Sequence, residues 1–546
     1  MADAQTARLC AQIINSHFGP LTAKVADALL TRGRLPVPQI VRATGLRPRT
    51  VRAACLVLLQ HNVLWYALDP IDGEVLEISP EECMLRLRFG RAVWQAGQLF
   101  GQAGSAIVQL VLDHGKLRPP QIVEQLSLSS PKETSLHRQT LHKLVSLAYL
   151  KPSTPKRHLS PRDKAIKYEL EEKAKIAGFP TAKELREAKE AAVARLRREE
   201  EEDAACGLVL ETRRRGGNGS ECTCGVYSAI DSPDIVQDEV YFRVNFDKFN
   251  THIRNQLIEK AARERFNEGA AAVMRAVLKA TESTQTGLTE ERSDAVSIGN
   301  IILNIPEDAD LASGLAISAS KASKSTCTKH YLDLLACADN PTPTGRASAF
   351  LSYGSKIQAE FGLIGRRLRR HVLEASAREK HGANGLRVVR LLLGSGKLDD
   401  KQVAHGVMLP AKDVRTVLAA LAADSLVSTQ EVPKTADRNP TRTFYLWHVD
   451  QTKAYTVLLG ELYKTLYNIG VRRQAEREEP MVRAVLEKRQ RTDVRADESL
   501  LTRLDREILG EWERKEEKLT VLEMRVEECV FLLRDLGVLG SEEIPV

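Results

Sequence analysis

The sequence predicts a mainly α-helical chain of several small domains that carry short β-hairpins and end in a helical hairpin. Its 546 residues are enough for three or four domains of about 150 residues each. Aromatic residues make up only 5% of the chain, and Leu, Val and Ala supply most of its apolar content, which favours helices packed on helices. A short motif recurs along the chain, and a long apolar stripe with dense charge follows near the C-terminal end.

The recurrent motif combines a glycine, a basic residue, a leucine and a later glutamine. It reads GRLPVPQIV at 33–41, GKLRPPQIV at 115–123 and GKLDDKQV at 396–403, each time after an apolar helical segment. The glycines are expected to end that helix, because a left-handed backbone suits glycine. The leucines are expected to enter the core as short extended segments. The next short helix is expected to begin at Pro38, at Pro120 and at Asp399 or Asp400.

A longer helix with one apolar face follows each copy of the motif, with the 3.6-residue period of an α-helix. Strand-like residues and a turn at 69–73 then predict a β-hairpin over 63–78, and the last copy ends similarly over 425–447. A helix, a short helix, a longer helix and a hairpin in this order are typical of the winged helix-turn-helix. A fourth, degenerate copy is expected from Val240 onward, with its recognition helix over 325–338.

The sequence therefore predicts tandem extended winged-helix domains followed by a C-terminal antiparallel coiled coil. Apolar residues at three-and-four spacing between Leu501 and Leu536 indicate the coiled coil, with a partner stripe over 455–469 and a turn near 490–499. Residues 163–203 are expected to form an exposed helix, and the Gly-rich residues 204–233 a flexible loop. The expected boundaries are 1–80, 81–160, 241–355 and 356–450 for the winged helices, 161–240 for the helical and flexible linker, and 451–546 for the coiled-coil hairpin.

Composition excludes several classes of protein. A net charge of +7, from 79 basic and 72 acidic residues, is too weak for a histone-like protein but permits local basic patches. No apolar run reaches the ~18 residues of a membrane helix, and the N-terminus lacks a signal-peptide core. The nine cysteines are scattered, which indicates buried thiols in a reducing compartment instead of a disulfide framework.

No residue pattern predicts a catalytic or metal centre. Cys222 and Cys224 have no second ligand pair for zinc nearby, and the glycine cluster 216–220 lacks the strand and lysine of a phosphate-binding loop. We therefore expect no cofactor, no metal and no enzymatic activity of the chain alone. Three histidines on or near one recognition-type helix are interpreted as surface residues or phosphate contacts, namely His137, His142 and His158.

Basic residues lie off the apolar stripe on several recognition-type helices. Such residues can contact phosphates, and each contact adds to the salt dependence of binding. Alternatively they belong to solvated faces, since many winged helices dock on proteins. The basic run 366–371 has the same alternatives: a phosphate-facing or acidic-partner edge, or a solvated helix face. The candidate DNA contacts are Arg47, Arg49, Arg52, Lys132, Arg138, Lys143, Lys412 and Arg415.

The apolar stripe of the C-terminal hairpin must be buried somewhere, because stripes of this length are rarely left in water. Residues 455–469 are expected to cover one side of it. The charge between its apolar positions suggests a hairpin that projects from the body and anchors the chain to a partner. We place Leu522 and Val526 in a packed seam. The candidate partner-interface residues are Leu519, Leu522, Val526, Val530 and Leu533.

The most distinctive stretches are MLPAKD at 408–413, QEVPKT at 430–435 and RTFYLW at 442–447. With them, residues 396–447 closely resemble the winged-helix subunit of the initiation heterotrimer of eukaryotic RNA polymerase III. Residues 244–249 and 254–258 resemble the start of that family's third unit, and 531–533 its final helix. The resemblance runs over nearly the whole chain and keeps the order of the units.

This resemblance implies four extended winged-helix domains and a C-terminal coiled coil, similar in design to the alpha subunit of TFIIE. It implies a non-catalytic, nuclear subunit of DNA-directed RNA polymerase III. The subunit would join two partners, one winged-helix and one with an acidic tail, on the polymerase clamp. There it would bind the initiation factor TFIIIB and help to open promoter DNA at genes for tRNA, 5S and other small RNAs.

Two other functions stay open at this point. A free winged-helix transcription regulator would read one site as a symmetric dimer and carry one dominant basic recognition helix. A winged-helix scaffold without a nucleic-acid role would have no basic recognition face. Because basic residues are spread over several units, the sequence favours a polymerase subunit that binds DNA largely without sequence preference.

Overall fold

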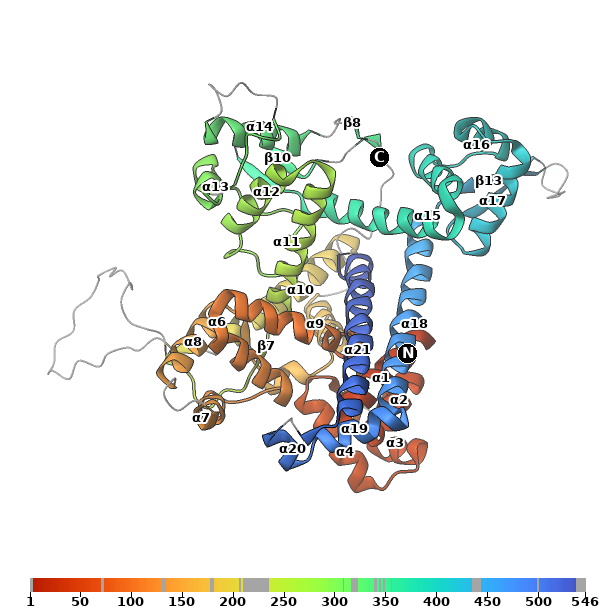
Figure 1. The fold of residues 1–546 in the computed structure, drawn as a ribbon. Coiled ribbons are helices and arrows are strands. Elements are labelled where there is room, and N and C mark those ends of the chain that lie inside the picture. Colours follow the sequence, from red (N-terminus) through yellow and green to blue (C-terminus); the bar gives the residue numbers. More distant parts are fainter. Residues whose placement is uncertain are drawn as a thin grey trace. The chain divides into compact units, whose positions relative to one another are not determined.

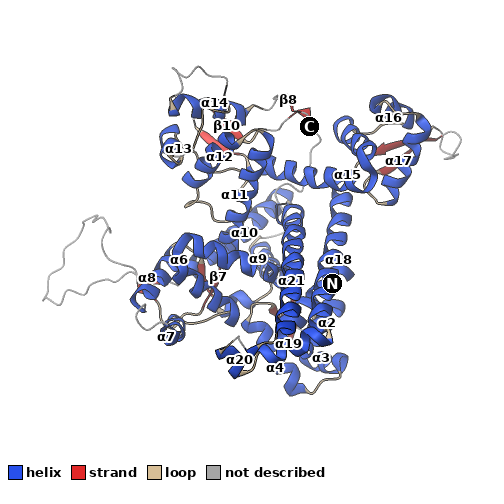
Figure 2. Cartoon of the chain, in the orientation of Figure 1, coloured by secondary structure: helices blue, strands red, loops and turns tan. Residues whose placement is uncertain are grey.

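Helices dominate the described part of this computed structural model (Figure 1, Figure 2). The strands described there form short antiparallel pairs and one three-stranded sheet. This confirms the predicted mainly helical class with small hairpins. The chain divides into two compact units, Met1–Asn250 and Thr251–Val546. No helix in the described residues is long and apolar enough to cross a membrane. The described residues are 3–69, 73–129, 134–176, 181–205, 208–209, 235–307, 309–315, 323–337, 341–342, 345–346, 349–354, 356–434, 443–497 and 500–536.

The first winged unit places its helices around a three-stranded antiparallel sheet in which β3 lies between β1 and β2. Leu35 of β1 pairs with Leu76, and Leu64 of β2 pairs with Ile78. Two short helical segments lead out of the unit. Its elements are α1 (Ala4–Phe18), α2 (Pro20–Arg32), β1 (Leu35–Pro36), α3 (Val37–Thr44), α4 (Pro48–Gln60), β2 (Leu64–Asp69), β3 (Gly73–Ile78), α5 (Pro80–Met84) and η1 (Leu85–Arg88).

The second winged unit has a sheet made of distant segments. Strand β4 pairs with β7, with Leu150 opposite Val244, and Leu117 forms an isolated bridge to Phe242 on the same strand. The placement of the 242–244 strand in the third unit is therefore wrong. Phe242 is fully buried in the core of the second unit, where it covers apolar residues that β4 leaves open. The elements are α6 (Phe89–His114), bent at Gly101, α7 (Pro119–Ser129), α8 (Thr134–Ser146), β4 (Leu150–Pro152), η3 (Pro155–His158) and β7 (Phe242–Val244).

The linker contains two packed helices, α9 (Pro161–Ala174) and α10 (Ala182–Ala205), where one exposed helix was expected. Glu199 accepts hydrogen bonds from Tyr168 Oη at 2.7 Å and from Lys164 Nζ at 3.2 Å, and Arg195 pairs with Glu171. These contacts set the two helices antiparallel. Farther along, β5 (Leu208–Val209) pairs with β6 (Ile235–Val236). Residues 210–234, which contain most of the expected flexible loop, lie outside the described residues.

The third unit is built around a buried arginine. Arg254 is 1% exposed, its guanidinium lies 3.6 Å from the centre of the Phe361 ring, and it donates to Gln285 Oε1 at 2.9 Å. Val296 bridges to Ile357 in the short wing. The elements are α11 (Phe246–Arg265), α12 (Glu268–Ala280), α13 (Ile298–Asn304), α14 (Lys324–Ala336), β8 (Pro341–Thr342), β9 (Gly345–Arg346), β10 (Leu351–Tyr353) and β11 (Ile357–Ala359).

The fourth unit repeats the pattern of the first. The long helix α15 bends at Gly382, and the wing pairs Val432 with Phe444. Asp399 caps the short helix through a capping box with Gln402. The elements are α15 (Phe361–Ser395), α16 (Asp400–Val407), α17 (Ala411–Ala423), β12 (Ser428–Pro433) and β13 (Thr443–His448).

The three copies of the glycine motif have one structure, as predicted. Each glycine follows the last residue of a helix with a positive φ: 84° at Gly33, 81° at Gly115 and 77° at Gly396. The leucine two residues later then pairs with a strand of the wing. These pairs are Leu35 with Leu76, Leu117 with Phe242, and Leu398 with Trp447.

Gly115 also permits a close approach between the first two winged units. A Cβ at this position would lie 2.4 Å from the backbone oxygen of Gln60, whose side chain donates to Lys116 O at 2.8 Å. We expect Gly115→Ala to destabilise the unit Met1–Asn250 by about 3 kcal/mol, since the clash adds to the cost of a positive φ. Urea unfolding would measure the loss.

Gly73→Ala is the matched control for that substitution. Gly73 has a φ of 72°, but a Cβ there would meet nothing within 4 Å. It should therefore cost only the backbone strain of about 1 kcal/mol. Equal losses for the two variants would mean that the contact with Gln60 imposes no constraint.

The C-terminal region contains two long antiparallel helices, α18 (Gln451–Glu478) and α21 (Arg503–Val530), joined through α19 (Pro480–Arg489) and α20 (Thr492–Ala496). Two ion pairs between the helices show the antiparallel order: Arg473 pairs with Glu523 at 2.9 Å, and Glu476, farther along α18, pairs with Lys515, earlier in α21, at 2.8 Å. The π-helical turn η7 (Phe531–Asp535) ends the pair. Coiled-coil packing along these helices stays a prediction.

Candidate nucleic-acid and partner interfaces

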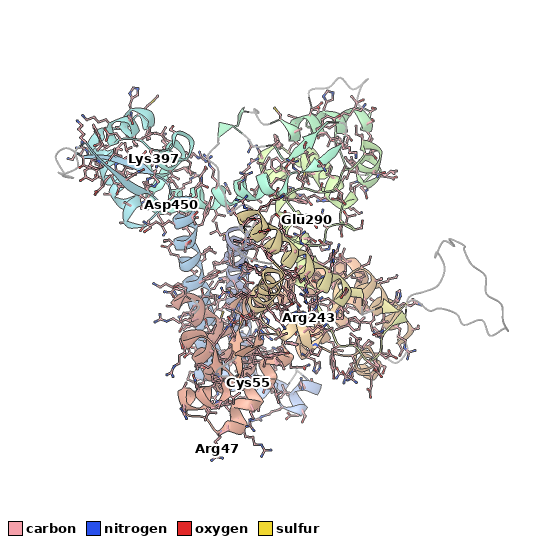
Figure 3. The ribbon with its side chains drawn as sticks, turned by 180° about the vertical axis from the view of Figure 1, so that it is seen from behind. Arg47, Cys55, Arg243, Glu290, Lys397 and Asp450 are labelled. Carbon is pink, nitrogen blue, oxygen red and sulfur yellow. The ribbon has the colours of Figure 1, made fainter. Side chains whose placement is uncertain are left out.

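The outward face of α4 has a basic half and an apolar half. Arg47, Arg49 and Arg52 are exposed at its N-terminal end, while the opposite face buries residues such as Val51. Arg47 projects at the outer end of the first unit, away from Cys55 on the buried side of the helix (Figure 3). Backbone N–H groups at a helix N-terminus favour anions, so this end suits a phosphate.

The C-terminal half of the same face contains a feature that sequence reasoning missed. Leu56 is 65% exposed and Val57 is 37% exposed. The sequence gave no signal that these two residues are exposed, because an apolar residue in this helix looks like a further core position. An exposed leucine beside basic residues suits a protein contact as well as DNA.

The candidate residues of α8 lie on a solvent face. Arg138 and Lys143 are exposed, and Lys132 lies outside the described residues. The interpretation of the nearby histidines as surface residues is wrong for two of them. His137 is 4% exposed and faces the core side of α8, and His158 is 7% exposed with its Nε2 2.8 Å from Lys116 Nζ.

On α17, Lys412 and Arg415 are both exposed. Arg415 is already paired, because its Nε donates to Asp400 Oδ2 at 2.7 Å. A phosphate would have to compete with this carboxylate. The face of α17 is therefore less basic than the sequence indicated.

The basic run 366–371 does not form a continuous phosphate-facing edge. Arg369 is 5% exposed with its guanidinium 5.6 Å from the Tyr455 ring, and that of Arg367 lies 4.8 Å from the Phe350 ring. Arg370 donates to Glu374 at 2.9 Å. The expectation of a solvated, phosphate-facing or partner-facing edge is therefore wrong for buried Arg369, whereas Arg366 and Arg370 are exposed and the alternatives stay open for them.

The apolar stripe of α21 is divided between solvent and core. Leu522 is 45% exposed, and Leu519 and Val526 are half-buried, so the seam expected at Leu522 is not closed within the chain. Val530 and Leu533 are 3% and 4% exposed, and Leu533 packs with the core of the fourth unit. These two residues are unavailable to a partner in this fold. Leu522 instead lies beside exposed Val521 and Met524.

No group of three or more metal-binding side chains occurs in the part of the chain that the structure describes. The surfaces just described have basic, apolar and mixed character.

Two family descriptions match the ends of the winged array. Residues 8–69 match the RNA polymerase III subunit RPC82 helix-turn-helix domain, and residues 373–449 match the POLR3C C-terminal winged-helix domain. Relatives named DNA-directed RNA polymerase III subunit RPC3 align over almost the full length. The human protein is 27% identical, with 96% of this chain and 97% of the relative covered. The Danio rerio protein is 26% identical, with 97% and 98% covered, and the Aspergillus niger protein is 24% identical, with 98% and 100% covered.

Over almost its full length the chain is similar to these RPC3 subunits. The predicted resemblance is confirmed, and so is the presence of winged-helix domains. The two matched regions coincide with the first winged unit, from α1 to β2, and with the fourth, from the later part of α15 to β13. The exposed arginines of α4 lie in the first region, and Lys412 and Arg415 lie in the second.

The joint between the first two winged units contains buried His158 and half-buried His61 beside cations. Desolvation lowers the pKa of His158 to about 4, with Lys116 and Arg243 lowering it further. Desolvation and Arg86 lower the pKa of His61 to about 4 as well. Both side chains are therefore neutral in the folded protein at neutral pH.

This arrangement predicts a loss of stability in mild acid. The unfolded chain binds these protons near the ordinary histidine pKa of 6.5, so stability falls as the pH falls from 6.5 towards 4. We expect about 2 kcal/mol less stability at pH 5 than at pH 7, after allowing for partial exposure. Urea unfolding measured by tryptophan fluorescence would show it. His158→Gln should weaken the dependence, and His405→Gln, at an exposed site in the second compact unit, should not.

Proposed function

We propose that this chain is a non-catalytic subunit of DNA-directed RNA polymerase III and acts in promoter-directed initiation. The observation that carries the proposal is similarity to RPC3 over almost the whole length of both proteins. The relatives' name places them in that polymerase. The nucleus is accordingly the expected location of this chain.

Within the polymerase we place the chain in a heterotrimer with one winged-helix partner and one acidic-tailed partner. Four winged units and a C-terminal hairpin provide separate surfaces for these partners, the polymerase core and TFIIIB. Exposed Val521, Leu522 and Met524 support a role for the hairpin as the anchor. A long helix pair that leaves large apolar side chains in water is typical of a protein-binding surface.

The DNA-binding part of the proposal rests on the exposed basic residues. Arg47, Arg49 and Arg52 lie at one helix end, and Arg138 and Lys143 lie on a second recognition-type helix. These are phosphate-type contacts, which give affinity without strong sequence preference. Such contacts suit a subunit that helps to hold and open promoter DNA wherever the polymerase is recruited.

Affinity purification of the tagged full chain from its own cells tests the assignment. The polymerase III core, the two heterotrimer partners and TFIIIB should copurify, and the isolated chain should show no polymerase, nuclease or NTPase activity. Recovery of the chain as a free homodimer that selects one short duplex sequence would support the regulator alternative. Recovery with other assemblies and without DNA affinity would support the scaffold alternative.

A further inference from the structure

A cavity of about 30 Å³ lies at the joint between the first and second winged units. Its polar lining comes from the end of α4, from α5 and η1, and from β7, all within the unit Met1–Asn250. Arg243, which contributes from β7, lies among side chains of several elements (Figure 3). The polar lining residues are His61, Asn62, Glu82, Arg86 and Arg243.

Arg86 is the unusual member of this lining. It is only 6% exposed, and its Nε has no hydrogen-bond partner. Its guanidinium lies 4.3 Å from the centre of the Phe18 ring and 5.2 Å from that of Phe89. The two aromatic rings contact the faces of the guanidinium. Its N–H groups lie in the guanidinium plane, so the rings do not serve as their hydrogen-bond acceptors. No carboxylate among the described residues forms an ion pair with it, and an unpaired buried charge costs several kcal/mol.

The other polar groups leave the cavity positively charged. Arg243 pairs with Glu82 at 3.5 Å, and its Nε has no hydrogen-bond partner. Two guanidiniums and one carboxylate therefore leave one positive charge at the cavity wall. Lys116 is close enough for Arg243 to lower its pKa, so it adds to the positive potential, whereas Lys151 is paired with Asp247 at 2.9 Å.

We propose that this cavity binds one small monovalent inorganic anion of the halide class. The anion would accept from Arg86 Nε and Arg243 Nε and neutralise the excess charge. The volume fits this ligand: a water-sized guest needs about 10–15 Å³, so the cavity holds a halide and one water, whereas a phosphate ester is too large. The water would donate to Asn62 Oδ1, which has no other partner.

The anion would stabilise the joint between the winged units. Asn62 donates to Gly115 O at 3.5 Å, and Gln60 donates to His114 O at 3.0 Å, so the cavity lies beside the backbone contacts that join the units. With the anion bound, Arg86 has a hydrogen-bond partner inside the cavity. Opening of the joint, which would let water hydrogen-bond to Arg86, then brings less gain in free energy. Exchange of amide hydrogens in the joint should therefore be slower in the presence of halide.

Bromide is the probe that tests the site. Crystals of the full chain soaked in sodium bromide should give an anomalous peak within hydrogen-bond distance of Arg86 Nε. Arg86→Met should abolish the peak, and Arg42→Met, at an exposed position on α3, should keep it. A cavity filled with water and without an anomalous peak would overturn the proposal.

Hydrogen exchange in solution tests the effect on the joint and remains informative if Arg86→Met fails to fold. Peptides that cover 57–64 and 112–119 of the wild-type chain should exchange at least about 2-fold more slowly in sodium chloride than in sodium gluconate of equal ionic strength. Peptides of α17 should not change. Equal exchange in the two salts would refute stabilisation of the joint by the anion.

Discussion

Replacing Val521 and Leu522 together by Asp is expected to release the chain from RNA polymerase III while its fold is preserved. Both side chains are more than 40% exposed on α21, so the substitutions remove little packing from the chain itself. In a complex that buries this surface, two carboxylates would be desolvated without partners. That costs several kcal/mol, which corresponds to a loss of affinity on the order of 100-fold or more.

The measurement is the recovery of polymerase core subunits with the tagged variant, beside circular dichroism of the purified chain. Gln474→Asp with Ala475→Asp is the matched control, because it adds two carboxylates at exposed, less apolar positions of α18. The control should retain the polymerase. If the Val521 and Leu522 variant also retains it, the hairpin is not the anchor and the winged units carry assembly.

Removing the three arginines of α4 is expected to produce the second large effect. With Arg47, Arg49 and Arg52 replaced by Ala, up to three phosphate contacts are lost. The slope of log affinity against log salt for duplex DNA should then become shallower by up to about 2.7. Fluorescence anisotropy at several salt concentrations would measure it.

A matched control separates these contacts from net charge. Replacing exposed Arg8, Lys24 and Arg32 by Ala also removes three cations from the first unit, but from α1 and α2. That variant should keep most of the salt dependence. An equal change in both variants would indicate a diffuse charge effect, and no change in either would remove the first unit from the DNA-binding surfaces.

Local signals in the sequence were sufficient to predict the repeated part of the fold. Gly33, Gly115 and Gly396 end helices because of a conformational preference that acts within a few residues. The position of the leucine two residues after each glycine is also set locally, by the short distance along the chain from the end of the helix to the sheet. The α4 arginines could be placed on an outer face because the helical period alone separates them from Val51.

Interactions between distant segments could not be predicted in this way. The pairing of β7 with β4 depends on which open sheet edge lies nearby after the linker has folded. Within the run 366–371, Arg367 and Arg369 lie against the rings of Phe350 and Tyr455, which come from elsewhere in the chain. The pairing of Arg415 with Asp400 likewise depends on how two helices pack. Periodicity identifies a face of a helix but does not identify its neighbour.

The pairing of β4 with β7 also has a consequence for synthesis on the ribosome. Phe242 emerges 90 positions after Pro152, its partner in the sheet, because 242 − 152 = 90. At about 5–20 residues per second, β4 waits roughly 5–18 s for its partner strand. During that interval the first winged unit has all of its strands, whereas the second presents an unpaired edge and an open core. Nascent chains of this protein are therefore most exposed to mispairing, and to chaperone binding, while the linker is being translated.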